Sequence, residues 1–165
     1  MSKNQMHASV YSMFEQEVSR GTNMSAGIDV RAPYDVMVDY TGKAVVDTGI
    51  IFKLIPDDAN KRYVTYLVPR SSAGIKKGIT LQNTIGVIDQ DYCGKKDFIK
   101  AAIKVDLPWY ERAIMFITRR KKKILDKSER FCQLLVHEVE TPKLLMRYTP
   151  PDTESRGGIG STNTK

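Results

Sequence analysis

Short apolar stretches recur along the chain between turn residues, and this pattern constrains its fold more than any other feature. In one stretch Ile99, Ala101, Ile103 and Val105 alternate with small or basic residues, the period of two that is typical of a half-buried strand. The stretches rich in β-branched and aromatic residues are 48–55, 62–68, 99–105 and 130–139. Many short strands of this kind predict an all-β sandwich or a closed barrel. The one helix that we expect is short, at 71–77.

The length of the chain predicts one domain with two appended segments. A chain of 165 residues can bury a core without disulfides or metals. We expect a β domain over 1–148 and a flexible tail over 149–165, because the tail is rich in Gly, Ser and Thr and has little apolar surface. Within the domain, 106–127 is expected to be a detachable basic insertion, in which Trp109 and Tyr110 pin the loop.

The net charge of +7 comes mostly from one run of basic residues. The run spans 119–123, and removing its five charges leaves +2. The basicity is therefore local, and by itself it does not indicate a nucleic-acid-binding protein. Such a run is typical of a solvated loop, while a contact with a protein or a weak contact with nucleic acid through 119–123 stays open.

The composition excludes a membrane protein and a disulfide framework. No segment approaches the roughly 20 apolar residues that a spanning helix needs, and the N-terminal residues contain no signal-peptide core. The two cysteines, Cys93 and Cys132, fit a reducing cytoplasm, and we expect both to be packing or turn residues.

Five polar segments rich in glycine and charge interrupt the β pattern. They are 26–30, 69–74, 83–94, 130–133 and 156–162. In the second, Arg70, Ser71 and Ser72 supply a guanidinium fork and two hydroxyls, which suit a phosphate group, and the last segment offers similar groups. Together with the carboxylates of Asp29 and Asp89, these segments suit a polyphosphate accompanied by Mg²⁺. Taken singly, each segment is also explained as an ordinary turn or helix cap.

Taken in order, the five segments resemble the five motifs of the trimeric deoxyuridine triphosphatase (dUTPase) family. The block 69–94 contains PRSSAGIKKGI and then N-x-x-G-V-I-D-x-D-Y-x-G with the family's internal spacing. The resemblance runs from about 26 to 162 and implies a β-barrel-like jelly roll that assembles as a homotrimer with sites at the subunit boundaries. It also implies hydrolysis of dUTP to dUMP and pyrophosphate, which limits uracil in DNA and supplies dUMP for dTTP synthesis. A small member with an insertion suits a phage or other virus, and hence a host cytoplasm.

The resemblance also implies a role for each matching residue. Asp89 would activate the water that attacks the α-phosphorus, and Asp29 would hold a water bound to the Mg²⁺ cofactor. Asn83 would bind uracil, Tyr92 would lie under the deoxyribose, and Arg156 would reach the terminal phosphate. The other substrate-binding positions that the resemblance implies are Arg70, Ser71, Ser72, Gly86, Gln133, Ile159, Gly160 and Ser161.

The chain departs from the family pattern at three places. Lys95 and Lys96 follow Gly94, where the family usually has Glu or Gln. The connection 98–128 is longer than an ordinary one. The last motif is two residues shorter than usual, and Ile159 replaces the aromatic residue that stacks on uracil, which weakens the expected closure of the tail.

Two alternatives to a dUTPase are open. A deoxycytidine triphosphate deaminase shares the fold, but it needs an acid–base group beside the pyrimidine, and between Asn83 and Lys96 the only carboxylates are those of Asp89 and Asp91. The second alternative is a regulatory or nucleic-acid-binding module on a dUTPase scaffold, with the basic run as its contact. Because every expected chemical group is present, we favour an active enzyme.

Overall fold

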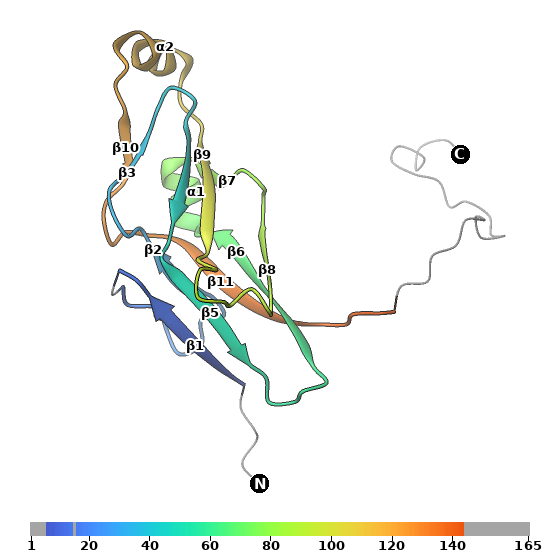
Figure 1. Cartoon of the computed structure of the whole chain (residues 1–165). Helices are drawn as coiled ribbons and strands as arrows, with labels where there is room; N and C mark the ends of the chain where they lie inside the picture. The colour runs from blue at the N-terminus through green and yellow to red at the C-terminus, as the bar shows by residue number, and fades with distance from the viewer. Residues whose placement is uncertain (1–5, 15, 144–165) are drawn as a thin grey trace, which may run out of the picture.

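The computed structural model describes residues 6–14 and 16–143, which form a mostly β fold (Figure 1). The strands are β1 (His7–Ser12), β2 (Ile28–Arg31), β3 (Val36–Val38), β4 (Lys43–Asp47), β5 (Ile50–Ile55), β6 (Arg62–Pro69), β7 (Ile79–Leu81), β8 (Gly86–Asp89), β9 (Lys100–Val105), β10 (Lys122–Leu125) and β11 (Arg130–Val139). The helices of this part of the chain are α1 (Ser71–Lys77) and α2 (Trp109–Thr118), and neither is long and apolar enough to cross a membrane. The expected all-β, jelly-roll-like fold is confirmed.

The strands pair in an antiparallel manner in four small sheets. The largest has the order β2-β11-β6-β8, a second has the order β4-β9-β7, and β1-β5 and β10-β3 form two-stranded ribbons. Strand β11 lies between β2 and β6, so that Gln133 is opposite Asp29 on one side and Val68 on the other. The pairing therefore brings together three of the polar segments that are far apart in the sequence.

The core is built from the inward-facing positions of these strands. In β9, Ala101, Ile103 and Val105 are buried, whereas Lys100 and Lys104 are exposed and Ala102 is partly buried, which confirms the predicted period of two. Phe131 and Leu134 of β11 are fully buried in the same core. This core gives the polar segments at the strand ends a rigid base.

Segment 106–127 differs from the prediction of a detachable insertion. It contains a ten-residue helix, α2, which the sequence did not predict, and strand β10, which pairs with β3. Leu107, Met115 and Leu125 are buried in the common core. The segment is therefore anchored to the domain near both ends and through its helix.

The aromatic residues that open α2 are also placed differently from the prediction. Trp109 and Tyr110 are 80% and 51% exposed. Their rings pack edge-on against each other, with centroids 6.2 Å apart. Because both rings stay in solvent, they do not pin the segment to the body of the protein.

Candidate active site

Strand β8 and its flanking turns line a small pocket of about 220 Å³, which we call the hairpin pocket. Four predicted site residues line it: Asn83, Gly86, Asp89 and Tyr92. Gly86 lies opposite Leu67 of β6, and a Cβ atom at Gly86 would lie 3.0 Å from the Leu67 Cβ. Glycine therefore permits the close approach of the two strands that shapes this pocket.

Backbone contacts fix Tyr92 and the turn that follows Asp89 in the hairpin pocket. The Tyr92 hydroxyl donates to the Phe98 carbonyl at 3.3 Å, and its ring stays 41% exposed. The Tyr92 N–H donates to the Asp89 carbonyl at 3.1 Å, which closes the turn after β8. Asp89 is exposed. The pocket thus offers a carboxylate and a ring edge from fixed backbone positions.

One charged residue of this pocket was not predicted as a site residue. Lys100, the first residue of β9, lines the same pocket as Asp89. In the sequence it is an outward-facing residue of an alternating strand, which carries no functional signal. Only the packing of β9 beside the hairpin brings Lys100 to the pocket.

A second group of predicted residues surrounds Asp29, and we call Asp29, Arg70 and Arg130 the arginine–aspartate cluster. The Nε of Arg70 lies 3.1 Å from Oδ1 of Asp29, and Nη1 of Arg130 lies 3.0 Å from Oδ2. The side chain of Asp29 is 5% exposed, whereas those of Arg70 and Arg130 are 26% and 42% exposed. The buried carboxylate thus orients two guanidinium groups whose other N–H groups are available to an anion. The sequence indicated the segment that begins with Arg130, but not this ion pair.

Gln133 lies beside the arginine–aspartate cluster, opposite Asp29 in the pairing of β11 with β2. A Cβ atom at Gly27 would collide with the Gln133 side chain. The glycine of the first polar segment therefore leaves the space that the Gln133 amide occupies.

Helix α1 places the two predicted serines next to this cluster. Arg70 is its N-terminal cap residue, and its N–H donates to the Phe131 carbonyl at 2.8 Å. Ser71 and Ser72 form the first turn and are exposed. The helix ends at Gly78, which has a φ of 64° and donates its N–H to carbonyls of the last turn. The serine pair therefore begins this short helix, and the glycine ends it.

Within one chain, the hairpin pocket and the arginine–aspartate cluster are separated along β6. Asp89 is opposite Val64, near one end of β6, and Arg70 follows Pro69 at the other end. Six residues of extended strand span roughly 20 Å. Asp89 and Arg70 of the same chain therefore do not meet at one phosphate group.

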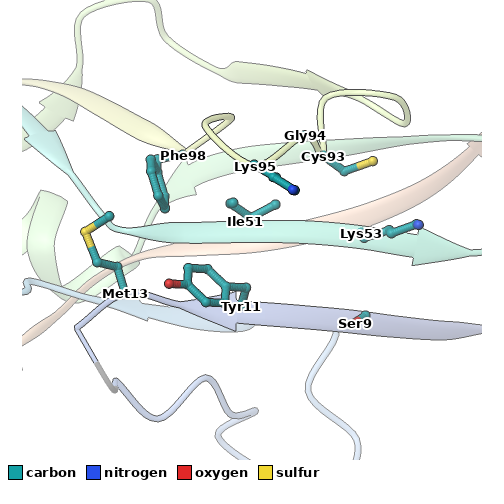
Figure 2. A pocket seen from close by; sticks show the side chains of 9 residues that line it. All are labelled: Ser9, Tyr11, Met13, Ile51, Lys53, Cys93, Gly94, Lys95 and Phe98. Carbon is teal, nitrogen blue, oxygen red and sulfur yellow. The ribbon is translucent and has the colours of Figure 1, made fainter.

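A larger hollow of about 550 Å³ lies on another side of the hairpin (Figure 2). Tyr11, Ile51 and Phe98 surround it from β1, β5 and the loop before β9. None of the predicted site residues lines this hollow. This hollow is thus larger than the hairpin pocket but lacks its chemistry, whereas a third hollow, of about 620 Å³, includes Asp89 in its lining.

The part of the chain that the structure describes offers no set of side chains that would enclose a metal ion. Among residues 6–14 and 16–143, no three His, Cys, Asp or Glu side chains form a cluster that could hold one. Each oxygen of Asp29 accepts one guanidinium contact and keeps a second lone pair. Mg²⁺ commonly binds substrate phosphates and waters with one or two carboxylates nearby, so these residues fit an ion that contacts the protein through water.

Two further sets of predicted residues complete the comparison with the sequence. Cys132 is buried in the core, as expected, and this burial raises the pKa of its thiol to about 12. The tail residues Arg156, Ile159, Gly160 and Ser161 lie outside the described residues.

The fold and the polar segments define a class of protein: a β jelly roll with an exposed carboxylate in a small pocket and paired arginines on the same sheet. A comparison with protein families is more specific, because the family model described as dUTPase matches residues 16–164. The chain belongs to the dUTPase family.

Individual proteins agree with this assignment. The deoxyuridine 5'-triphosphate nucleotidohydrolase of Paramecium bursaria Chlorella virus 1 is 31% identical over 87% of this chain and 86% of its own length. The structure of the Staphylococcus bacteriophage 80alpha dUTPase with dUPNHPP covers 97% of this chain and 99% of its own, with a TM-score of 0.67 and 22% identity. A mutant dUTPase from phage phi11 of S. aureus, described with a structural Mg(II) ion, covers 88% and 98%, with a TM-score of 0.62 and 19% identity. The two structures confirm the fold.

Proposed function

We propose that this chain hydrolyses dUTP to dUMP and pyrophosphate, which limits uracil in DNA and supplies dUMP for dTTP synthesis. One observation carries the proposal: in a chain of the dUTPase family, Asn83, Gly86, Asp89 and Tyr92 line one small pocket. The reaction belongs in the cytoplasm, or in the host cytoplasm if the protein is viral.

Asp89 is the general base of the proposed reaction. Its carboxylate accepts a proton from a water molecule as the water oxygen bonds to the α-phosphorus. The bond from that phosphorus to the oxygen bridging the α and β positions then breaks, and pyrophosphate leaves. Its exposed position on β8 allows a water to lie within hydrogen-bond reach.

The hairpin pocket selects the nucleoside. The amide of Asn83 can both donate to and accept from the polar edge of uracil. The ring of Tyr92, fixed through the Phe98 carbonyl, lies under the deoxyribose and leaves no room for a 2′-hydroxyl. A misfitting nucleotide would leave polar groups of this pocket unpaired, which is a strong basis for rejection.

Arg70, Ser71, Ser72 and Gln133 bind the phosphate chain in this proposal. Asp29 orients the Arg70 guanidinium for that purpose and would hold a water bound to the Mg²⁺ cofactor. When bound, Mg²⁺ neutralises part of the charge of the triphosphate. Most of the remaining effect comes from the positions of the protein's own donors.

The proposed site lies between subunits of a homotrimer. The separation of Asp89 from Arg70 along β6 supports this arrangement, because one triphosphate can contact both residues only if they come from different chains. The tail of 149–165 then closes the site, with Arg156 on the terminal phosphate and Ile159, Gly160 and Ser161 over the nucleotide.

The reaction is tested by measuring pyrophosphate release from dUTP, dTTP, dCTP and UTP, with and without Mg²⁺. We expect turnover of dUTP in strong preference to the other three. Release of ammonia from dCTP would instead identify a deaminase, and no turnover of any nucleotide would favour a regulatory module.

The shared site is tested separately with mixed trimers. Asp89→Asn and Arg70→Gln should each be inactive alone. Unfolding and refolding the two together at equal amounts should restore activity at about a quarter of the sites, because a random threefold assembly places the two intact residues at one boundary that often. Mixed trimers that form, as seen by native mass spectrometry, but stay inactive would contradict the shared site.

A further inference from the structure

Helix α2 exposes its apolar side. It lies at the opposite end of the molecule from β1 (Figure 1). Its exposed large apolar side chains are Trp109 (80%), Tyr110 (51%), Ile114 (55%), Phe116 (62%) and Ile117 (78%). At 3.6 residues per turn, these positions share one side of the helix. Met115 is its only buried residue.

The side of α2 that faces the protein is largely polar. Glu111 forms an ion pair with Lys122 at 2.6 Å, and Nε of Arg112 donates to the Tyr40 carbonyl at 3.1 Å. A surface helix of a globular protein normally buries its apolar stripe and exposes its charged side. In α2 this orientation is reversed, and a contiguous exposed apolar surface marks an interaction site.

A hollow of about 470 Å³ adjoins the apolar side of α2. Tyr40, Phe116 and Ile117 line it, and the rings of Tyr40 and Phe116 meet edge-on with centroids 5.0 Å apart. An aromatic hollow of this size can accept a bulky apolar side chain, which is the usual anchor of a protein–protein contact.

The rim of this hollow carries unbalanced positive charge. Arg119, Arg120 and Lys121 line the hollow together with one acid, Asp39. The next two lysines of the run are neutralised, Lys122 by Glu111 and Lys123 by two aspartates. Within 6–14 and 16–143, Arg119, Arg120 and Lys121 form no ion pair. Charge complementarity therefore favours an acidic occupant.

We propose that the apolar side of α2 and the adjoining hollow bind a protein segment in which bulky apolar side chains alternate with Asp or Glu. Nucleic acid is disfavoured because its interfaces are strongly polar, whereas Trp109, Ile114 and Ile117 offer aliphatic and aromatic surface. A membrane surface is disfavoured because binding to lipids does not require a hollow with a charged rim. The basic residues also follow the helix at one end instead of covering its polar side. The proposal uses no residue of the candidate active site.

The test uses a phage-displayed library of random peptides of about 15 residues, selected against the intact protein. Enriched peptides are synthesised, and their affinity is measured by fluorescence anisotropy. We expect the selected sequences to combine Asp or Glu with Trp, Phe or Leu. Ile117→Ser and Arg120→Ser should each weaken binding by about thirtyfold, the lower limit of a hot-spot effect. The matched controls Ile75→Ser and Lys76→Ser, on exposed positions of α1, should leave the affinity unchanged.

Several results would overturn the proposal. One such result is a selection that yields no peptide whose binding depends on Ile117, or only peptides without acidic residues. Binding of the intact protein to phosphatidylserine vesicles, or to DNA, that is lost in both Ile117→Ser and Arg120→Ser would replace the protein partner with a membrane or a nucleic acid. If sedimentation shows that Ile117→Ser changes the number of chains in the assembly, a second copy of this chain covers α2 instead.

Discussion

The hairpin pocket and the arginine–aspartate cluster position polar side chains by different physical means. In the hairpin pocket, Asp89 and Tyr92 are exposed, and tight backbone turns hold them. In the arginine–aspartate cluster, a buried carboxylate joins arginines from different strands and turns. The pocket is thus organised by local chain geometry, and the cluster by contacts between distant segments. Substitutions of the exposed side chains that line the pocket should therefore change chemistry without changing stability, whereas substitutions in the cluster should change both.

The largest expected effect is that of Asp89→Asn on turnover. The amide keeps the shape of the carboxylate but cannot accept the proton, so turnover of dUTP should fall by ~10² or more, the usual contribution of a general base. Binding of dUTP and the melting temperature should stay close to those of the unchanged protein, because Asp89 is exposed. Steady-state kinetics and calorimetry check both parts, and a near-normal rate would rule out the assigned base.

The next effect is that of Asp29→Ala on stability. Removal of this carboxylate leaves two guanidinium groups without their shared partner. Breaking a buried ion pair in this way costs 3–5 kcal/mol, and because both arginines are partly exposed we expect roughly 2–3 kcal/mol here. Denaturant unfolding measures the loss. Asp91→Ala, at an exposed turn position, is the control and should change the free energy of unfolding little.

A smaller effect, of opposite sign, is expected for Thr84→Asn in the turn before β8. Thr84 has a φ of 64°, a left-handed conformation that a β-branched residue rarely adopts and that asparagine tolerates better. The free energy of unfolding should rise by about 0.5–1 kcal/mol, because strain is released. Thr80→Asn, on strand β7, should bring no such gain, and equal responses of the two threonines would exclude backbone strain as the cause.

The smallest effect is expected outside both regions. Changing Arg119, Arg120 and Lys121 together to Ser should leave dUTP turnover within about twofold of normal, since general-base and phosphate-binding roles fall to other residues. A large loss of turnover in the same kinetic assay would place segment 106–127 at the active site. The hairpin pocket and the arginine–aspartate cluster would then not be the only two regions of that site.

The sequence was most informative where the structure is local. The alternation at 99–105 predicted a strand that is observed as β9, and the short helix expected at 71–77 is observed as α1. The four hairpin residues were predicted together because a turn and its flanking strand lie within ten residues of one another. Period, turn chemistry and spacing depend on neighbours along the chain, and the sequence contains those neighbours.

The sequence was least informative where a segment depends on distant partners. The run at 109–118 is apolar on the side that faces solvent, so its pattern did not predict a helix resting on the protein through polar contacts. The ion pair of Arg130 with Asp29 joins residues 101 positions apart. Lys100 reaches the hairpin pocket only because β9 packs beside it.

The amino-acid sequence by itself determined the β character of this protein, its order of polar segments and its family. Only the tertiary structure decided which of those segments meet, that segment 106–127 is anchored in the core, and that α2 exposes its apolar side. The physical reason is the range of the interactions: backbone propensity and turn geometry act over a few residues, whereas burial and ion pairing act between surfaces that the fold must first bring together.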